Sequence, residues 1–182
     1  KTIGDVNALE VYKKLLQHTV DVTQGLSCTK TVHYSVKIRS NDIWNESIYK
    51  KFKQEGDELG ERMHHAFEQL LKKGHDKVII IGSDLYDLTP EHINQAFKAL
   101  DNHDVVIGPA QDGGYYLLGM KTLHQDIFKN KDWGTNTVFK DTMQNLSGLK
   151  VHLLEVLNDV DVFDDIKDYD IFKPYLRNTI TK

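Results

Sequence analysis

The order of apolar and polar residues predicts helices and strands that alternate along the chain. Near the start, Asp5 could cap a first helix. One face of this helix carries residues at helical spacing, namely Ala8, Tyr12, Leu15, Leu16 and Thr19. Segment 31–37 (TVHYSVK) then alternates as a strand with one buried face does. A second helix is expected from Asp57, and Gly74 ends it, because glycine tolerates the left-handed conformation that follows many helices.

The clearest strand prediction is segment 77–81 (KVIII), which is short, β-branched and continuously apolar. This pattern is typical of a strand covered on both faces. Thr89 and Pro90 next predict a helix start, with a capping hydroxyl and a proline at the first helical position. The remaining elements are strands at 104–108, 115–120 and 150–156, with helices at about 136–146 and 164–176. Alternation of this kind predicts a three-layer α/β/α fold with a mostly parallel mixed sheet.

The composition fits one soluble domain over residues 1–182. Hydrophobic residues make up 40% of the chain and charged residues 27%, which is too apolar for disorder. The net charge of -4 gives no electrostatic case for a nucleic-acid or membrane-surface binder. No apolar run approaches the ~20 residues that span a bilayer. The single cysteine, Cys28, excludes a disulfide framework and a multi-cysteine zinc site, so a reducing, cytoplasmic compartment fits best.

Acidic residues follow the predicted strands, at the sheet edge where α/β proteins bind their ligands. Gly82, Ser83 and Asp84 come directly after the strand 77–81. A carboxylate at that position can hold Mg²⁺ or Mn²⁺, which in turn neutralises a diphosphate. The alternative is an ordinary turn, because Asp, Ser and Gly are common turn residues.

A second polar loop, 109–116 (PAQDGGYY), follows the next buried strand. Gly113 and Gly114 remove two side chains where the backbone must turn or lie against a ligand. Asp112 beside them is free for a sugar hydroxyl, an acceptor or a role as base. Asp-Gly is equally a strong hairpin signal, so the local pattern leaves a plain hairpin open.

The third loop, 158–166 (NDVDVFDDI), is the most acidic segment of the chain. Asp164 and Asp165 suit the first turn of a helix, where the helix dipole favours negative charge. Asp159 and Asp161 precede that turn and point the same way if the segment is extended. Such a pair repels unless a cation lies nearby, and a solvated acidic loop is the alternative. The three loops together indicate a crevice for a metal-bound phosphate ester. No GxxxxGK[ST] or GxGxxG motif supports a P-loop NTPase or a Rossmann dehydrogenase.

Five motifs occur in a fixed order, and together they resemble a small bacterial glycosyltransferase-like family. The motifs are 56–67 (GDELGERMHHAF), 82–93 (GSDLYDLTPEHI), 108–120 (GPAQDGGYYLLGM), 133–135 (WGT) and 159–166 (DVDVFDDI). Some members of that family are labelled arsenosugar-biosynthesis glycosyltransferases. The family is part of the nucleotide-diphospho-sugar transferase (GT-A) superfamily, whose more distant members include the molybdenum-cofactor and phospholactate guanylyltransferases. The resemblance is close over residues 56–166 and implies a GT-A-type fold.

The resemblance also implies roles for particular residues. Asp84 and Asp161 stand where the superfamily places metal ligands for Mg²⁺ or Mn²⁺, and Asp112 stands on the acceptor side as the expected catalytic residue. Nucleotide or substrate contacts are implied for Gly60, Arg62, Gly82, Ser83, Gly113 and Gly114. For Arg62, which could hold a phosphate as a planar donor, the alternative is a surface ion pair with Glu58 or Glu61.

Trp133 lies in a polar, turn-rich segment, 130–136 (NKDWGTN). A large aromatic in such a loop suits a stacking wall for a sugar or an acceptor, so we expect a mobile loop over the substrate crevice. The alternative is a core anchor that plugs the base of a helix.

Two departures from the family pattern bear on the site. Tyr86 occupies a position where the family usually has proline. The family normally opens with a strand and a basic, glycine-containing loop that holds the nucleotide phosphates, whereas this chain begins with Lys1, Thr2, Ile3 and Gly4. We therefore expect a single GT-A-like domain over residues 1–182 that lacks its first strand and phosphate-binding loop. Either those residues are missing from this sequence, or the protein does not bind nucleotide in the family's manner. The first explanation is favoured, because omitting the first strand would leave a central position of the sheet empty.

The function expected first is a metal-dependent glycosyltransferase that moves a sugar from a nucleotide-sugar donor to a small acceptor. A nucleotidyltransferase on the same fold is the alternative, because the fold does not decide between the two. A degenerate, non-catalytic ligand-binding domain is a third hypothesis. In each case the expected partners are small molecules and not nucleic acid or a membrane. Release of a nucleoside diphosphate indicates sugar transfer, whereas pyrophosphate indicates nucleotidyl transfer.

Overall fold

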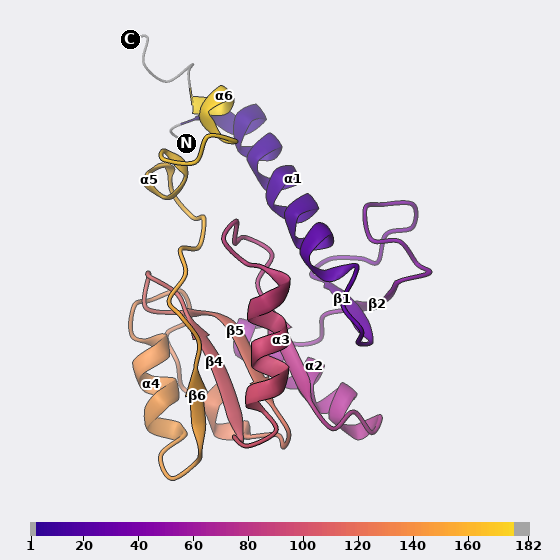
Figure 1. Cartoon of the computed structure of the whole chain (residues 1–182), viewed down its shortest axis with the longest axis vertical. Helices are drawn as coiled ribbons and strands as arrows, with labels where there is room; N and C mark the ends of the chain where they lie inside the picture. Colours follow the sequence, from indigo (N-terminus) through magenta and orange to yellow (C-terminus); the bar gives the residue numbers. More distant parts are fainter. Residues whose placement is uncertain (1–2, 177–182) are drawn as a thin grey trace.

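The computed structural model describes residues 3–176 as two β-sheets with helices packed around them (Figure 1). The strands are β1 (Lys30–Tyr34), β2 (Tyr49–Lys53), β3 (Val78–Ile81), β4 (Val105–Pro109), β5 (Tyr115–Met120) and β6 (Val151–Leu153). The helices are α1 (Gly4–Thr23), α2 (Leu59–Lys72), α3 (Pro90–Ala99), α4 (Val138–Asn145), α5 (Phe163–Ile166) and α6 (Lys173–Leu176), with a 3₁₀ turn η1 (Gln125–Phe128). No helix in this part of the chain is long and apolar enough to cross a membrane.

The larger sheet has four strands in the order β3-β5-β4-β6. Strand β5 pairs antiparallel with both β3 and β4, whereas β4 and β6 are parallel. It follows that β3, β4 and β6 run in one direction and end at the same edge of the sheet. The loops that follow these strands are the three acidic loops of the sequence, so the expected convergence of the strand ends is confirmed.

Helices cover both faces of this sheet, because successive side chains of a strand point to opposite faces. Val106 and Leu117 pack in one core with Leu100 at the end of α3. Their neighbours Val105 and Leu118 pack in another, with residues of α2, η1 and the end of α4. All four strand residues are at most 1% exposed. The predicted α/β/α arrangement with a mixed sheet is therefore correct.

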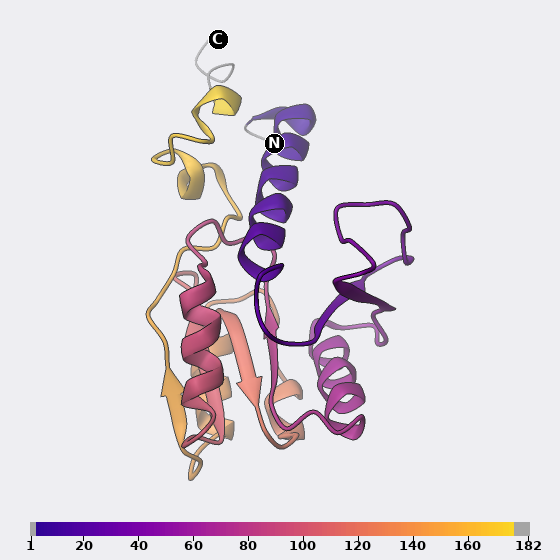
Figure 2. The ribbon, with the colours of Figure 1, turned by 45° about the vertical axis from the view of Figure 1, so that its right-hand side comes forward.

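The smaller sheet consists of β1 and β2, which are parallel, with Lys30 opposite Tyr49. Strand β2 was not predicted, because YKKFK carries three lysines and reads as polar surface. Its Tyr49 is buried and packs with Val20 and Trp44, which fixes the strand to the end of α1. Figure 2 shows β1 and β2 standing apart from the four-stranded sheet.

Strand β3 departs from the prediction that both of its faces are covered. Val78 is buried, but Ile79, Ile80 and Ile81 are partly exposed. The cause is topological, since β3 is an edge strand whose one partner among the described residues is β5. A groove of about 920 Å³ runs along its open side and is lined by residues of β1, β3, α1 and α2.

The last predicted helix, 164–176, is also a correction, since the structure has two short helices there. Helix α5 ends at Ile166 and α6 begins at Lys173. Between them Phe172 is completely buried, in a cluster with Val11 and Leu15 of α1. Pro174 cannot continue a helix from the preceding turn, because it lacks a backbone N–H, but it suits the start of a new one.

Candidate active site at the carboxyl edge of the sheet

Asp84 lies in the loop after β3, where Leu85 anchors the chain in the core with 2% of its surface exposed. The Asp84 carboxylate folds back over Gly82, and a side-chain carbon built at Gly82 would lie 2.6 Å from Asp84 Oδ1. Glycine is therefore needed at position 82 for this orientation. The neighbouring Ser83 places its carbonyl oxygen 3.5 Å from the Thr19 hydroxyl of α1.

Asp112 lies at the turn of a hairpin that joins β4 to β5, so the hairpin interpretation of this loop is correct. The Gly114 N–H donates to Asp112 Oδ1 at 2.7 Å, which orients the carboxylate and leaves Oδ2 free of that bond. Gly113 has a φ of +91°, and a side-chain carbon there would lie 2.4 Å from the carbonyl oxygen of Asn136. Both the backbone angle and the close approach require glycine.

Asp159 and Asp161 lie in the loop between β6 and α5. The Val160 N–H between them donates to the Asp84 carbonyl oxygen at 3.0 Å. The Asp165 carboxylate accepts the N–H groups of Asp161 at 2.8 Å and Val162 at 2.7 Å. Asp165 thus accepts backbone N–H groups at the start of α5, as predicted, whereas the carboxylates of Asp159 and Asp161 take no part in these bonds.

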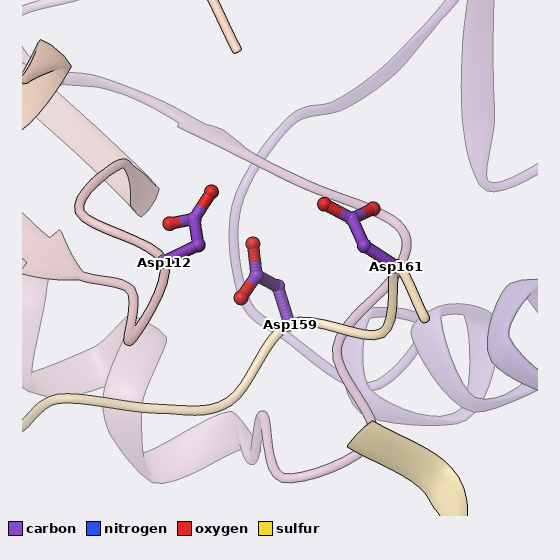
Figure 3. Close-up of side chains that lie close together, drawn as sticks. All are labelled: Asp112, Asp159 and Asp161. Carbon is purple, nitrogen blue, oxygen red and sulfur yellow. The ribbon is translucent and has the colours of Figure 1, made fainter. Parts of the chain in front are cut away.

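The β4–β5 turn and the loop between β6 and α5 bring three carboxylates together (Figure 3). One oxygen from each of Asp112, Asp159 and Asp161 lies within 4.8 Å of the other two, and the side chains point into a common space. Asp159 is half-buried, whereas Asp112 and Asp161 are exposed. From the sequence Asp159 was paired with Asp161 as an acidic pair that needs a nearby cation, but Asp84 and Asp161 were named as the metal ligands. The signal for it was its place at the strand end, two residues before Asp161 on an extended segment.

Burial and the negative charges of neighbouring carboxylates both raise pKa values in this cluster. Desolvation raises the pKa of Asp159 to about 6, with further contributions from Asp112, Asp161 and Asp84. The pKa of Asp84 is also raised, by desolvation first and then by Asp161 and Asp112. Asp84 retains exposed surface, so water screens part of this effect. Like charges that raise one another's pKa favour a nearby cation. Asp84, which was predicted as a metal ligand with Asp161, is not among the three carboxylates whose oxygens lie within 4.8 Å of one another.

The donor set fits Mg²⁺ or Mn²⁺. These hard cations prefer oxygen ligands and commonly take only one or two protein carboxylates, with water and phosphate as the other ligands. Asp112, Asp159 and Asp161 offer carboxylate oxygens at mutual distances that suit one ion. Neither histidine nor cysteine belongs to this group of described residues, which argues against a zinc-type site.

Arg62 takes up neither of the two roles considered for it. Its guanidinium donates to the carbonyl oxygens of Gly56 at 3.0 Å and Asp57 at 3.1 Å, and more weakly to Gln54 at 3.5 Å. These bonds fix the loop that leads into α2. A phosphate contact by Arg62 stays a prediction, and it would require some of these bonds to be exchanged.

Gly60 and Trp133 lie against each other. A side-chain carbon at Gly60 would come within 2.5 Å of the Phe128 carbonyl oxygen and 2.7 Å of the Trp133 ring. Gly60 is buried, so it allows the close packing of α2, and the substrate contact expected for it stays a prediction. Trp133 is half-buried, and its loop touches Gly113 through Asn136. The loop therefore adjoins the Asp112 turn, while the stacking role of Trp133 stays a prediction.

Comparison with known proteins places these features in a family. Residues 17–135 match the family described as an uncharacterized protein conserved in bacteria (DUF2064). A solved structure from Desulfovibrio desulfuricans G20, which carries the provisional name nucleotide-diphospho-sugar transferase, is 28% identical with a TM-score of 0.79. The match covers 96% of this chain and 84% of that chain. The fold is thus of the nucleotide-diphospho-sugar transferase type.

Two further similarities are more partial. The 2-phospho-L-lactate guanylyltransferase of Methanocaldococcus jannaschii is 33% identical over 82 residues, which are 45% of this chain and 34% of that protein. The chain therefore matches about a third of the length of this curated relative. A Mycobacterium sp. strain JC1 homologue of the Mycobacterium tuberculosis protein Rv0371c shares the fold, with a TM-score of 0.56 and 12% identity over 90% of this chain and 84% of its own.

Proposed function

We propose that this chain, which belongs to the DUF2064 family of bacterial proteins, is a metal-dependent transferase that acts on a nucleotide-activated donor. The observation that carries the proposal is the convergence of Asp112, Asp159 and Asp161 at the carboxyl edge of the sheet. Ligands of α/β proteins bind at this edge. A divalent cation held there supplies the positive charge that a diphosphate leaving group requires.

In this proposal Asp159 and Asp161 hold the cation from one loop, and Asp84 supports them from the neighbouring loop. The Val160 to Asp84 backbone bond keeps the two loops at a fixed separation. Repulsion among the carboxylates is relieved when the cation binds, so the raised pKa of Asp159 supports the assignment. Water and the donor's phosphate oxygens complete the ligand set, as is usual for Mg²⁺ and Mn²⁺.

Asp112 is assigned to the acceptor. Its Oδ1 accepts the Gly114 N–H, which holds the carboxylate toward the space shared with Asp159 and Asp161. From that position Oδ2 can orient an acceptor hydroxyl and take its proton. Asp112 is close enough to ligate the ion instead, and Asp112→Asn separates the two roles.

For the group transferred, we propose a sugar. The support is the 28% identity, over nearly the whole chain, to the protein named a nucleotide-diphospho-sugar transferase. Nucleotidyl transfer is the second candidate, and the 82-residue match to a guanylyltransferase favours it. The two reactions share the cation and the diphosphate chemistry and differ in the bond that breaks. Sugar transfer breaks the bond from the sugar carbon to the diphosphate, and nucleotidyl transfer breaks the bond between the α- and β-phosphates.

The test is a product analysis with the natural gene product, Mn²⁺, and panels of nucleotide sugars and nucleoside triphosphates. Sugar transfer releases a nucleoside diphosphate, and nucleotidyl transfer releases pyrophosphate. Asp161→Asn is expected to remove turnover, whereas Asp126→Asn, an exposed substitution on η1, leaves it unchanged. If neither product forms and calorimetry detects no binding of any nucleotide with Mn²⁺, the domain is a non-catalytic one and the proposal is wrong.

A further inference from the structure

Two histidines from separate elements meet near the amino end of β4. The rings of His103 and His152 lie 5.1 Å apart between centroids and are tilted by 56°. His103 lies in the turn that leads into β4, and His152 is the middle residue of β6. Both residues are half-buried. Asp112, Asp159 and Asp161 come after the carboxyl ends of these two strands, so the histidine pair is a separate place in the molecule.

The sheet and α3 together bring the two rings to one face. Strands β4 and β6 are parallel, and Val106 lies opposite His152. Residues that lie opposite each other on neighbouring strands point to the same face of a sheet. Val106 packs with Leu100 at the end of α3, so His152 is on the face that α3 covers. The turn after α3 then carries His103 to it.

The His103 ring is fixed in one tautomer. Its Nδ1 atom lies 2.9 Å from the Ala99 carbonyl oxygen. A carbonyl oxygen can only accept, so Nδ1 carries the proton and Nε2 keeps its lone pair. The backbone N–H of His103 donates to the same oxygen at 3.0 Å, which holds the turn against the helix. Metal-bound histidines commonly donate their second ring N–H to a carbonyl or a carboxylate in this way.

The other nitrogens of the pair are open. Within residues 3–176, neither Nε2 of His103 nor the ring of His152 takes part in a hydrogen bond, and none of these nitrogens is enclosed without a partner. They are therefore accessible to an ion from solvent. The pair also lies just beyond the carboxyl end of α3, where the helix dipole favours positive charge.

We propose that His103 and His152 hold a transition metal ion of the Zn²⁺, Cu²⁺ or Ni²⁺ class. Imidazole nitrogen suits these ions, whereas Mg²⁺ and Mn²⁺ prefer oxygen. Two nitrogens on one such ion lie about 3 Å apart, and rings at this separation can bring their edges that close. Water completes the ligand set, since no third His, Cys, Asp or Glu of the described residues joins the pair.

A bound ion would tie α3 to β6. Strand β6 is an outer strand of three residues whose one strand partner in the described part of the chain is β4, so it has few other bonds to hold it. An ion that binds the folded chain and not the unfolded one stabilises the fold by mass action. The inference does not depend on the transferase activity, and its tests use no turnover.

A second pair of histidines provides the comparison. The rings of His64 and His65 lie 5.5 Å apart between centroids, but both residues belong to α2. Neighbours on a helix point about 100° apart. The His64 ring also packs edge-on against Phe128, at 5.7 Å. His65, which is exposed and has its Nδ1 atom 3.0 Å from the Glu55 carbonyl oxygen, is thus a matched control for His103.

The first test is electron paramagnetic resonance of Cu²⁺ added to tag-free protein in excess Mg²⁺. The expected spectrum has couplings from two imidazole nitrogens at one equivalent of copper. Loss of even an outer-shell partner lowers metal affinity about 10–100-fold, so His103→Gln and His152→Gln should each lower it at least about tenfold. His65→Gln should leave it unchanged. A spectrum without nitrogen couplings, unchanged binding in His152→Gln, or binding lost in His65→Gln would overturn the proposal.

The second test is the melting temperature with and without Zn²⁺. Zinc is expected to raise it by a few degrees in the parent protein, and hydrogen exchange should slow in peptides that cover β6. Circular dichroism of the metal-free variants checks that they fold. Asp161→Asn should keep the zinc effect, and His152→Gln should lose it. The opposite result, an effect kept by His152→Gln and lost by Asp161→Asn, would place the zinc at the aspartates and contradict the proposal.

Discussion

The backbone N–H of Val160 donates to the carbonyl oxygen of Asp84 at 3.0 Å. This bond joins the loop after β6 to the loop after β3, although the two residues are far apart in the sequence. Asp84 on one loop and Asp159 and Asp161 on the other are thereby held at one place. The side chains that repel one another are fixed by a backbone contact that does not depend on their charge, so the cluster can exist before a cation binds.

The role of Asp112 can be separated from that of a metal ligand by Asp112→Asn. An amide keeps the turn and can still accept the Gly114 N–H through its oxygen, but it cannot take a proton. Loss of a positioned base lowers the rate by about 10²–10⁴. We expect kcat to fall in that range while the affinities for nucleotide and Mn²⁺ change little. Steady-state kinetics and calorimetry measure the two quantities, and a parallel loss of Mn²⁺ affinity would make Asp112 a ligand.

The raised pKa of Asp159 predicts that the stability of the metal-free protein depends on pH. Its pKa is about 6 in the folded state against 3.8 for the free side chain, raised by desolvation and by Asp112, Asp161 and Asp84. The folded state therefore holds the proton more tightly than the unfolded state. Its contribution is fully present below pH 3.8 and is lost as the pH rises through about 6.

Asp159→Asn removes that dependence. In a chelator at pH 7.5, we expect the variant to melt a few degrees above the parent protein, and at pH 4 the two should melt alike. Thermal unfolding followed by circular dichroism measures the difference. Saturating Mn²⁺ should stabilise the parent and not the variant. A variant that is less stable than the parent at pH 7.5 without metal would show that the Asp159 carboxylate is not under repulsion.

Tyr86 is expected to position the acidic loop after β6. Its ring packs against Phe172, at 5.3 Å between centroids, and against Tyr169, at 5.4 Å, and both lie in the segment that continues from that loop. The Tyr169 hydroxyl in turn donates to Asp87, at 2.5 Å, in the loop that carries Asp84. These contacts hold the two loops together from outside the cluster, at the position where the resembling family has proline.

Tyr86→Ala should therefore weaken Mn²⁺ binding several-fold, because loss of the ring loosens the loop that carries Asp159 and Asp161. Electron paramagnetic resonance of free Mn²⁺ measures this affinity. Tyr86→Phe keeps the ring and should bind Mn²⁺ as the parent does. Tyr12→Ala, an exposed substitution on α1 with 53% of Tyr12 accessible, is the control for a general effect of removing a tyrosine. Unchanged affinity in Tyr86→Ala would contradict the positioning role.

Gly60→Ala tests the packing role that the structure gives to this glycine. The added methyl group would lie 2.5 Å from the Phe128 carbonyl oxygen, a contact that the backbone must shift to relieve. Overpacking of this kind costs about 1–3 kcal/mol of the free energy of unfolding. Gly25→Ala is the matched control, since nothing lies within 4 Å of the added carbon. Denaturant unfolding measures both. Equal stability of the two variants would return Gly60 to the residues considered for substrate contact.

The sequence predicted the parts of the fold that depend on continuous apolar patterns. Strands β4 and β5 lie within one residue of their expected positions, and α3 begins at Pro90, because buried strands and helix starts have strong local signals. Strand β2 was missed because lysines on an outer edge look like a loop. The break between α5 and α6 was missed because it depends on where Phe172 finds a cavity among residues of α1.

The candidate site was predicted to the level of its loops and not of its contacts. Asp84, Asp112 and Asp161 were identified because each follows a strand that ends at one edge. Asp159 was recognised as the partner of Asp161 but not named as a metal ligand, since its position beside Asp112 depends on how the Val160 hydrogen bond to Asp84 holds the loop. The packing of Gly60 against Phe128 and Trp133 joins three separate segments, and no local pattern carries that information.

The most direct test of the cation site is anomalous diffraction from crystals of the natural gene product grown with Mn²⁺ and a nucleoside diphosphate. Manganese scatters anomalously, so its position is found without reference to the expected ligands. We predict one peak within coordination distance of Asp159 and Asp161, with diphosphate oxygens among its other ligands. A nucleotide bound at the sheet edge with no manganese peak beside these two carboxylates, or a peak held by other residues, would contradict the account.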